Sequence, residues 1–574
     1  MACRKFSLAF VCVVAAVTFA TQAEPQRSGQ GRSMTITRGG IVAAESPLAA
    51  QAGAQALARG GSAVDAAIAA NAVMGVVSPM MNGIGGDLFA IVYDAKSGRR
   101  FGMNASGWAP RGLTPEFLRA HGITTMPDHG IHSVTVPGAV EGWIKLHEKF
   151  GRRPLAEDLS AAVRIAEEGY PVTEWVALYW QHSVLEAHED PAAAKLYLPG
   201  GSSPHVGELF RNPELAAALR RIGEHGHDGY YRGETAQKIL AAEARFGGTM
   251  AADDLAEFSA EWVEPISTTY RGWTVYEMPP NGQGIAALLM LNILGKVDFS
   301  GAKQNSADVL HTEIEAKKLA YADMLHYVAD PRFAKVPVAE LLSAEHTSAR
   351  AAQLDARHAS CKVAPLEVHA ASAAAGPAPT LPAQAGDTTF LSAVDREGNM
   401  VSLIQSNYDY FGAGIVAEGA GFALQNRGAL FSLDPASPNV LAGRKRPLHT
   451  IIPAQMEKGT TRIAFGIMGG WNQSQAHVQF VVNVVDFGFN IQAALEAPRF
   501  TKRTFEGCDV EMEDGIPADV RANLESRGHK IQVHAGYSPS VGGGQAVLRD
   551  FATGINYGAS DPRKDGAAIP EPEK

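Results

Sequence analysis

The side chains of greatest chemical interest are two adjacent threonines, Thr388 and Thr389, which follow Asp387. A cut after Asp387 would make Thr388 a new N-terminus, so that one residue would carry both a hydroxyl nucleophile and a free α-amine. An α-amine has a pKa of about 7.7–8.0, close to what a general base needs at neutral pH. A threonine beside an N-terminal amine is a known way to activate a weak nucleophile. The sequence therefore predicts a catalytic Thr388 that is released by cleavage between Asp387 and Thr388.

Thr388 opens a predicted β-hairpin. Residues 388–394 and 400–406 are the expected strands, and the turn over 395–399 is rich in Asp, Gly and Asn. The segment before the hairpin, 363–385, consists largely of Ala, Pro and other small residues, a composition typical of a mobile and accessible stretch. An accessible stretch in front of a buried strand fits a processing site, and its composition fits a plain interdomain linker equally well.

A second candidate element is the pair Gly469-Gly470 at a strand-to-helix junction. The sequence predicts a strand over 462–468 and a helix from 472 to about 485. Backbone N–H groups at such a junction point at one spot near a helix N-terminus and can bind an oxyanion. A tight turn is the commoner interpretation of a lone Gly-Gly pair. Further helices are predicted over 47–59, 63–76, 136–150 and 313–328, and further strands over 88–93, 101–104 and 422–426.

Composition and charge restrict the class of protein. The chain of 574 residues is 46% hydrophobic and 19% charged, which is ordinary for a globular protein with a large core. Its formal net charge of −10 argues against a nucleic-acid partner, because such proteins usually present a basic face. An apolar run over 6–20 follows Arg4 and Lys5 and ends in small residues, as in a secretory signal peptide over 1–23. The run is short for a membrane anchor, so we expect a periplasmic or secreted protein without a membrane span.

Cys361 and Cys508 are the cysteines that remain once the signal peptide is removed. In an exported protein two cysteines can pair, and a bridge between these two would tether the two sides of the proposed cut. Their distance in space does not follow from the sequence, so a disulfide and two free thiols stay open as alternatives.

Three further patterns are interpreted without a role in catalysis or ligand binding. The loop Gly83-Ile-Gly-Gly-Asp87 superficially resembles a phosphate loop, but a helix precedes it and a strand follows it, which favours close backbone packing. His225 and His227 lie in a glycine-rich turn without a further ligand nearby, which favours a solvated loop over a metal site. Ser300-x-x-Lys303 matches a motif of penicillin-recognising enzymes, but the partner motifs are absent and the match is interpreted as chance.

The hairpin, the double glycine and several flanking segments together resemble the γ-glutamyltransferase family of N-terminal-nucleophile hydrolases. The matching segments are Gly60-Gly-Ser-Ala-Val-Asp65, Gly83-Ile-Gly-Gly-Asp87, Val136-Pro-Gly138, Asp387-Thr-Thr389, Asp395-x-x-Gly-Asn399, Lys445-Arg-Pro447, Gly469-Gly470 and Gly558-Ala-Ser-Asp-Pro-Arg563. Each segment alone is weak, but the set in this order is highly specific. The resemblance implies an α+β fold, a four-layer αββα sandwich formed jointly by a large subunit over 24–387 and a small subunit over 388–574.

The resemblance also implies the roles of the residues at the reaction centre. Thr388 is the nucleophile, first of self-cleavage and then of catalysis. Ser406 stands where the family usually has a second threonine that hydrogen-bonds the nucleophile, and its hydroxyl preserves that role. Gly469 and Gly470 match the glycines of the family's oxyanion hole.

The residues at the positions that bind the γ-glutamyl group differ from the family pattern. His449 and Thr450 fall on a Ser-Ser pair that binds the donor's α-carboxylate, and of the two only Thr450 keeps a hydroxyl. Ser106 takes the place of the family's carboxylate-binding arginine. These positions remain the expected substrate-binding residues of this chain.

Three more positions of this pocket differ. Tyr408 stands where the family has an asparagine, and Arg427 where it has a glutamine. The aspartate that reads the α-ammonium falls near Leu430. Loss of the fixed arginine and aspartate removes two charge-assisted contacts of roughly 1.5–3 kcal/mol each. Arg427 offers a replacement cation and is counted among the expected substrate-binding residues.

By this resemblance the chain is a self-processing amidohydrolase or acyltransferase that acts on γ-glutamyl amides such as glutathione through an acyl-enzyme on Thr388. An acylase with a glutaryl-type amide substrate, as in the γ-glutamyltransferase-like and cephalosporin-acylase branches, is the alternative within the family. A processed but inactive periplasmic binding protein is the alternative outside it. The mechanism calls for neither a metal nor an organic cofactor, and the expected partners are a small amide substrate and the two subunits of one precursor.

Overall fold

The computed structural model describes residues 30–368 and 387–573. The predicted signal peptide (1–23) and most of the Ala/Pro-rich segment (363–385) lie outside these residues, so neither prediction is tested. Within the described ranges, no helix combines the length and the apolar character that crossing a membrane requires.

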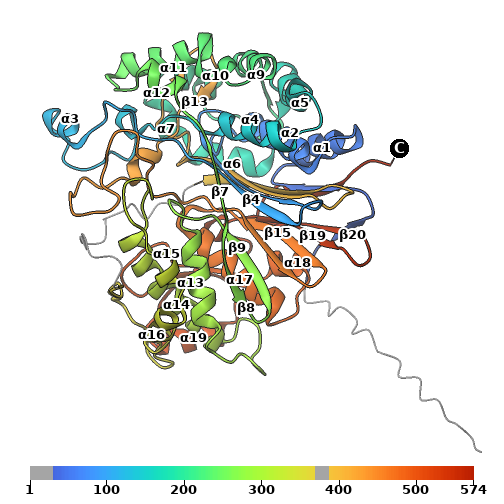
Figure 1. Cartoon of the computed structure of the whole chain (residues 1–574), viewed down its shortest axis with the longest axis vertical. Coiled ribbons are helices and arrows are strands. Elements are labelled where there is room, and N and C mark those ends of the chain that lie inside the picture. Colours follow the sequence, from blue (N-terminus) through green and yellow to red (C-terminus); the bar gives the residue numbers. More distant parts are fainter. Residues whose placement is uncertain (1–29, 369–386, 574) are drawn as a thin grey trace, which may run out of the picture.

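Two stacked β-sheets form the centre of the molecule (Figure 1), and among the described residues each has seven strands. The upper sheet contains, in spatial order, β21 (Ala567–Pro570), β2 (Ile41–Ala44), β10 (Asp387–Val394), β11 (Met400–Tyr408), β3 (Asp87–Asp94), β4 (Arg99–Ala105) and β7 (Glu261–Val263). The lower sheet contains β1 (Thr35–Thr37), β20 (Ile555–Ser560), β19 (Gly544–Asp550), β15 (Thr461–Ile467), β14 (Ala454–Lys458), β9 (Trp273–Glu277) and β8 (Ile266–Tyr270). Between the sheets an apolar cluster joins Phe89 and Phe390 to Ile451.

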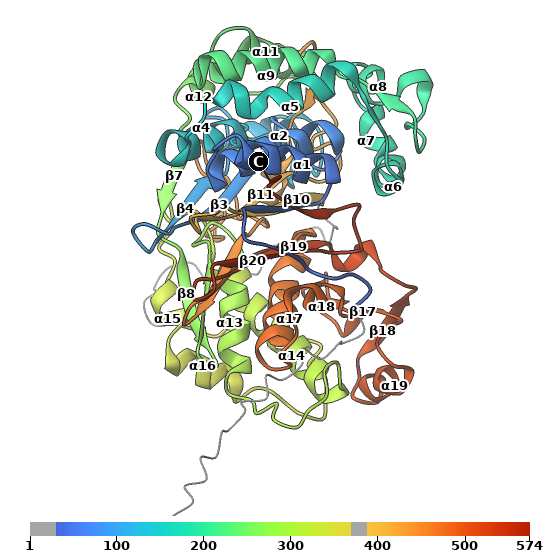
Figure 2. The same ribbon diagram turned by 90° about the vertical axis from the view of Figure 1, so that its right-hand side faces the viewer.

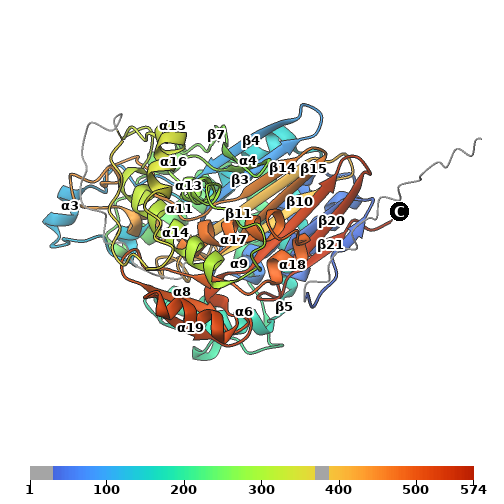
Figure 3. The same cartoon turned by 90° about the horizontal axis from the view of Figure 1, so that it is seen from below.

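Helices cover the outer face of each sheet, so that the molecule has four layers (Figure 2). The upper helices include α1 (Pro47–Ala58), α2 (Ala63–Val77), α4 (Ala139–Phe150), α5 (Leu155–Glu168), α9 (Pro213–His225) and α11 (Gly233–Phe246). The lower helices include α13 (Gly284–Leu294), α14 (Ala307–Tyr327), α17 (Gln473–Val485) and α18 (Ile491–Glu496). In the view from below (Figure 3), α13, α14 and α17 lie over the lower sheet. The predicted α+β fold with an αββα sandwich is confirmed.

Strands from both sides of residue 387 contribute to both sheets. In the upper sheet the hairpin β10–β11 lies between β2 and β3, which come from much earlier in the chain. In the lower sheet β14 pairs with β9 on one side and with β15 on the other. Neither part of the chain alone completes a sheet, in agreement with the jointly formed sandwich that the sequence predicts.

The predicted hairpin is confirmed, and its turn also fastens a helix of the upper layer. The carboxylate of Asp395 accepts the backbone N–H groups of Asn399 at 2.9 Å and of Ala63, the first residue of α2, at 3.2 Å. At the same helix end, Ser62 and Asp65 form a capping box. The two sequence motifs around 62 and 395 therefore meet in space and fix the position of α2 over the hairpin.

Most predicted elements agree closely with the structure, and two differ. The strand predicted over 422–426 is confined to β13 (Phe422–Ala423), because the amide of Gln425 turns inward and donates to Asp87 at 2.8 Å. The helix predicted over 313–328 begins earlier, at Ala307. Its first turns are stabilised by packing of Leu310 against residues of another segment, a tertiary contact that no local pattern marks.

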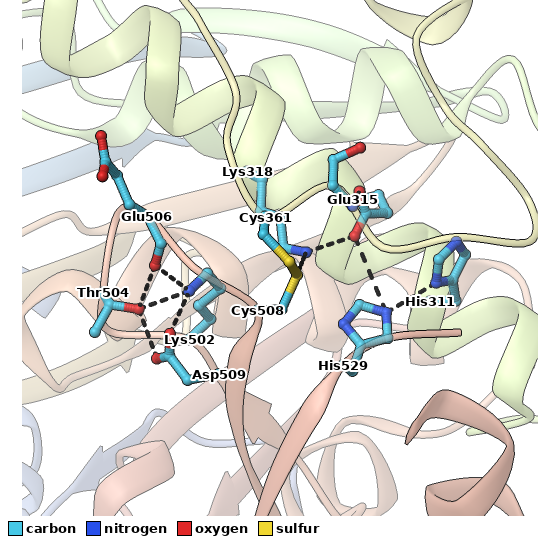
Figure 4. Close-up of a disulfide and its surroundings, with 11 residues drawn as sticks. His311, Glu315, Lys318, Cys361, Lys502, Thr504, Glu506, Cys508, Asp509 and His529 are labelled. Atoms are coloured by element: carbon cyan, nitrogen blue, oxygen red, sulfur yellow. Dashed lines mark hydrogen bonds and ion pairs between the residues drawn. A yellow bond between two sulfur atoms is a disulfide. The ribbon is translucent and has the colours of Figure 1, made fainter. Parts of the chain in front are cut away.

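Cys361 and Cys508 form a disulfide (Figure 4), which decides between the alternatives left open by the sequence. Their Cα atoms are 4.8 Å apart. Cys361 is exposed in the loop after α16 (Ala344–Ala351), whereas Cys508 is buried directly before β17 (Asp509–Glu513). The ammonium group of Lys318 lies 3.9 Å from the sulfur of Cys508. The bridge therefore links the two sides of the predicted cleavage site.

Beside the disulfide, His311, Glu315 and His529 come together (Figure 4). His311 Nδ1 and His529 Nε2 are 2.8 Å apart, a hydrogen-bond distance. Two nitrogen ligands of one tetrahedral zinc ion would be about 3.3 Å apart. The carboxylate of Glu315 already accepts a hydrogen bond from the ammonium of Lys318 at 2.6 Å. We therefore interpret the group as a hydrogen-bond network between α14 and the segment that precedes β18 (Lys530–His534).

The disulfide is expected to stabilise the fold. In a Thr388→Ala chain, which lacks the predicted nucleophile for cleavage, replacing Cys361 by serine and Cys508 by alanine should lower the free energy of unfolding by about 2–4 kcal/mol, because the unfolded chain gains conformational entropy. Urea unfolding followed by circular dichroism measures the difference, and reductant added to the Thr388→Ala chain with both cysteines should reproduce it. Equal unfolding midpoints for the oxidised protein and the double variant would contradict a stabilising role.

Candidate active site

The predicted glycine loop is a close-packing element at the base of the site. A Cβ atom on Gly85 would lie 2.0 Å from the carbonyl oxygen of Ala423, and one on Gly86 would lie 2.4 Å from that of Ser406. Both distances are far inside van der Waals contact, so a side chain fits at neither position. Asp87 follows the loop and pairs with Ser406 across β3 and β11. The packing role favoured by the sequence is confirmed.

Thr388 and Ser406 face each other across the central strands of the upper sheet. The hydroxyl of Thr388 donates to Ser406 Oγ at 3.2 Å, and the same oxygen accepts the backbone N–H of Tyr408 at 2.8 Å. All three residues are buried. The strand register shifts between Asp387 and Thr389, and Tyr408 has a φ of 83°, which is unusual for a residue with a bulky side chain. The backbone is thus irregular at the predicted cleavage site.

Gly469 and Gly470 lie between β15 and α17, as predicted. Their φ values are 125° and 55°, in the region that favours glycine. Among the residues that the structure describes, no acceptor takes up the backbone N–H of either glycine. A Cβ atom on Gly466 would lie 2.4 Å from the ring of Phe390, so the strand before the double glycine touches the strand that carries Thr388. Two unpaired N–H groups at this junction fit an oxyanion site.

Gln283 connects the double glycine to another predicted site residue. Its side-chain Nε2 donates to the carbonyl oxygen of Gly470 at 2.8 Å and also to that of Thr450. The hydroxyl of Tyr321, which donates to the carbonyl oxygen of Trp471, also lies 3.2 Å from Gln283 Oε1. Sequence reasoning missed Gln283, and the sign that could have found it is the turn-forming run Pro279-Pro-Asn-Gly282 in front of an apolar helix.

His449 is committed to an internal hydrogen bond. Its Nε2 donates to the carboxylate of Asp87 at 2.9 Å, and its Nδ1 accepts the backbone N–H of Ile451 at 3.3 Å. Burial, reinforced by the nearby Arg427 cation, lowers the pKa of His449 to about 4. The ring is therefore neutral at physiological pH, and in this structure it supports Asp87.

Ser106 is held in the same wall of the site. Its hydroxyl donates to Asn104 Oδ1 at 2.7 Å and accepts from Asn281 Nδ2 at 3.2 Å, while its carbonyl oxygen accepts from Arg446 Nε at 3.0 Å. Asn281 also accepts the backbone N–H of His449 at 2.9 Å. The position at which the resemblance implies a cation is thus a small buried hydroxyl.

The guanidinium of Arg427 is a positive charge within the site. It begins the short helix η3 (Arg427–Leu430), donates from Nη1 to Thr450 Oγ1 at 2.6 Å, and lies over the ring of Tyr408 at 4.5 Å. Within the described parts of the chain, its Nε and Nη2 have no hydrogen-bond partner. Burial lowers the pKa of Arg427 to about 10, so it remains charged at neutral pH. A buried cation with unpaired donors is costly, and a carboxylate ligand would satisfy it.

Leu430, at the position where the family binds the α-ammonium group, is apolar. Leu430 is buried in the core of the lower half, where it belongs to the same cluster as Tyr408 and Leu448. Two carboxylates act on the guanidinium of Arg427, Asp87 more strongly than Asp409. Asp409 is buried, lies 3.8 Å from a ring nitrogen of His129, and has its pKa raised to about 6 by burial.

Hydrogen bonds and ring contacts join most of the predicted residues into one site. The path runs from Thr388 through Ser406, Tyr408, Arg427, Thr450 and Gln283 to Gly470. Ser106 and His449 lie in the wall behind it. The arrangement combines a hydroxyl nucleophile, unpaired N–H groups and a buried cation, which together suit attack on the carbonyl of an amide that also carries an anionic group.

Known proteins are similar to this chain over most of its length. The family model described as gamma-glutamyltranspeptidase matches residues 49–571. A glutathione hydrolase-like proenzyme of Bacillus subtilis is 34% identical, over 91% of this chain and 96% of the relative. An oxamate amidohydrolase proenzyme of Klebsiella pneumoniae is 32% identical, over 93% and 99%. The crystal structure of a cephalosporin acylase from Bacillus halodurans is 41% identical, with a TM-score of 0.86 over 96% of this chain and 99% of that one.

Gln283 is expected to stabilise the site through its two carbonyl partners. In a Thr388→Ala chain, which lacks the predicted nucleophile for cleavage, a Gln283→Leu substitution should lower the free energy of unfolding by about 1–3 kcal/mol, because buried carbonyl groups lose a donor. The matched control is Gln545→Leu on β19, since neither polar atom of that buried amide has a partner among the described residues. Urea unfolding compares the two variants, and an equal loss in both would refute the bridging role.

Proposed function

Because the chain belongs to the gamma-glutamyltranspeptidase family of amidohydrolases, we propose that it cuts itself before Thr388 and then acts through an acyl-enzyme on that residue. The observation that carries the proposal is the 3.2 Å hydrogen bond from Thr388 to Ser406 at the irregular start of β10. The unpaired N–H groups of Gly469 and Gly470 support it, because they supply the oxyanion site that both reactions need.

In the first stage, Thr388 Oγ attacks the carbonyl carbon of Asp387. The bond between this carbon and the Thr388 nitrogen breaks, and the acyl group forms an ester with Oγ. The proton of the hydroxyl passes to the Thr388 nitrogen, which becomes an amine. Water then hydrolyses the ester, which releases the carboxylate of Asp387 and restores the Thr388 hydroxyl. The products are a large subunit over 24–387 and a small subunit over 388–574. Ser406 orients the attacking oxygen throughout.

In the second stage, the Thr388 α-amine, with a pKa of about 7.7–8.0, accepts the proton of Oγ directly or through a water molecule. Oγ attacks the substrate amide, and the N–H groups of Gly469 and Gly470 hold the oxyanion. Loss of one such donor typically costs about 10²–10³ in rate. The amine product leaves with the proton, and water or an amine acceptor then resolves the acyl-enzyme.

The acyl group that fits the site best carries a carboxylate and no ammonium group. Arg427 supports this substrate class, since it is a buried cation with two unpaired donors beside Thr450. Leu430 supports it as well, because the expected ammonium reader is an apolar core residue. Oxamate, from which one relative takes its name, is itself an amide with a carboxylate and no ammonium. A glutaryl-type amide is the longer member of this class that we propose.

γ-Glutamyl amides such as glutathione are the second candidate substrate class. Asp409 favours them, because it is a buried carboxylate one residue from Tyr408 and acts on Arg427. The name of the glutathione hydrolase-like relative points the same way. An inactive binding protein finds no support, since the relatives named above are all enzymes.

We place the enzyme in the periplasm or outside the cell. The signal-like segment over 1–23 supports export. The disulfide supports it too, because such bonds persist in oxidising compartments and are rare in the cytosol.

Self-cleavage predicts two chains on a denaturing gel run with reductant. The smaller chain should begin Thr-Thr-Phe, and a Thr388→Ala variant should stay intact because it lacks the attacking oxygen. Without reductant the Cys361–Cys508 bridge should keep both pieces in one band. N-terminal sequencing of the smaller band gives the cleavage position.

The matched control is Thr389→Ala. The hydroxyl of Thr389 is buried and has no partner among the described residues, so its removal should leave cleavage intact. A Thr388→Ala chain that still cuts at the same bond would remove the basis of the proposal.

Two anilides that differ only in the α-ammonium separate the substrate classes. We expect a higher kcat/KM for glutaryl-p-nitroanilide than for γ-glutamyl-p-nitroanilide. Arg427→Gln should lower kcat/KM for the glutaryl substrate by roughly 10- to 150-fold, the equivalent of a charge-assisted hydrogen bond. Release of nitroaniline is followed by absorbance.

Butyryl-p-nitroanilide provides the control, because it has the same leaving group and no carboxylate. Arg427→Gln should change its hydrolysis little. A preference for the γ-glutamyl substrate that Asp409→Asn abolishes would instead establish the second candidate.

A further inference from the structure

Glu45 takes the place of a strand partner for the first residues of β10. In the described part of the sheet, pairing between β2 and β10 ends with Ala44 opposite Leu391. Beyond this pair, the side chain of Glu45 accepts the backbone N–H of Phe390 at 2.8 Å. Glu45 and Phe390 are both buried. A carboxylate therefore continues the hydrogen bonding of β2, two residues away from Thr388.

The charged groups that face Glu45 come from the C-terminal segment after β20. Lys564 Nζ lies 3.7 Å from the carboxylate of Glu45. Asp561 also acts on Glu45, but its own charge is matched by Arg499 at 2.7 Å and by Arg563 at 3.0 Å. Burial raises the pKa of Glu45 to about 7, and the attraction of Lys564 limits this rise. Glu45 thus changes its charge near neutral pH.

Lys564 has weak contacts apart from Glu45. Its ammonium lies 3.9 Å from the sulfur of Met81 and 4.0 Å from the centroid of the Tyr179 ring. Lys564 is itself buried. Glu45 is therefore the counter-ion of Lys564, and the two side chains hold each other beside the start of β10.

The hydrogen bond to Glu45 lies two residues along the strand from the Thr388 nitrogen. The strand register shifts between Asp387 and Thr389, so the residues that Glu45 holds begin the regularly paired part of β10 after Thr388. After the proposed cut the Thr388 nitrogen is the α-amine.

We infer that Glu45, held by Lys564, is a positioning residue for the nucleophile: its carboxylate anchors the N-terminal segment 388–390 of the small subunit. The inference rests on the proposed function, because it takes Thr388 as the nucleophile. In the precursor, the peptide bond to Asp387 restrains Thr388. Once this bond is cut, a free chain end tends to fray, and the hydrogen bond from Phe390 to Glu45 holds the segment in register with Ser406.

The anchor depends on pH in a defined direction. An ionised carboxylate accepts an N–H more strongly than a protonated one. Because the pKa of Glu45 is about 7, the anchor should be strong above this pH and should weaken as the pH falls through it. Substrate hydrolysis by the cut enzyme should show the same dependence, in addition to the titration of the Thr388 α-amine.

Two substitutions of Glu45 separate its hydrogen bond from its charge. Glu45→Ala removes the acceptor, so amide hydrogen exchange in peptides over 388–394 should become roughly fivefold faster or more, the equivalent of one lost hydrogen bond. Glu45→Gln keeps an acceptor oxygen without the charge. It should restore much of the protection and make the acid side of the pH profile of glutaryl-p-nitroanilide hydrolysis less steep, because the Thr388 α-amine then titrates there without Glu45.

Glu243→Gln on α11 is the matched control. Glu243 is also buried, accepts the backbone N–H of Met250 at 3.2 Å and has its pKa raised to about 7 by burial, but it lies in the upper helical layer. Its substitution should leave the pH profile and the exchange over 388–394 unchanged.

The outcomes separate this inference from the proposed function. Unchanged exchange in Glu45→Ala, or a pH profile of Glu45→Gln that matches that of the unaltered protein, would overturn the role of Glu45. Failure of the unaltered protein to cut before Thr388 would overturn the proposed function, and the exchange comparison would still report whether Glu45 anchors the strand.

Discussion

The buried carboxylate of Asp87 is the interaction on which the rest of the site depends. It accepts the backbone N–H of Gly107 at 2.7 Å, the amide of Gln425 at 2.8 Å and the imidazole of His449 at 2.9 Å. A buried charge without partners is strongly unfavourable, so these donors must converge where Asp87 lies. They come from three distant segments, and the strand that begins at Asp87 pairs directly with the strand of Ser406.

This convergence also explains why two donors of Arg427 have no hydrogen-bond partner among the described residues. His449 uses the second oxygen of Asp87, and its neutral ring adds no positive charge. The charge of Asp87 acts on Arg427 from a distance, and the guanidinium donates its hydrogen bond to Thr450. The protein thus satisfies its buried anion completely and its buried cation partly. The unsatisfied side of Arg427 is where recognition of an anionic substrate costs the least desolvation.

Sequence patterns predicted those parts of the site that depend on local order. The hairpin, the double glycine and the glycine loop each follow from turn residues and alternation within a short stretch, and the structure has all three. Gln283, the Asp87–His449 pair and the Cys361–Cys508 bridge were not predictable, because each joins segments whose distance no spacing encodes. The unpaired donors of Arg427 were not predictable from the sequence either, because the lack of a hydrogen-bond partner depends on how the whole chain packs.

The presence of strands from both sides of residue 387 in each sheet affects how the molecule can fold and refold. Before a cut, folding is unimolecular, and the hairpin β10–β11 reaches its place between β2 and β3 through a continuous chain. After a cut, the two pieces are joined through the Cys361–Cys508 bridge, and reassembly would require the hairpin β10–β11 to enter again between β2 and β3 without the continuous chain. Denaturation of the cut form then becomes effectively one-way, and its lifetime is set by the rate of unfolding and not by an equilibrium. The continuous chain through residue 387 thus serves the folding of the precursor and is absent from the cut form.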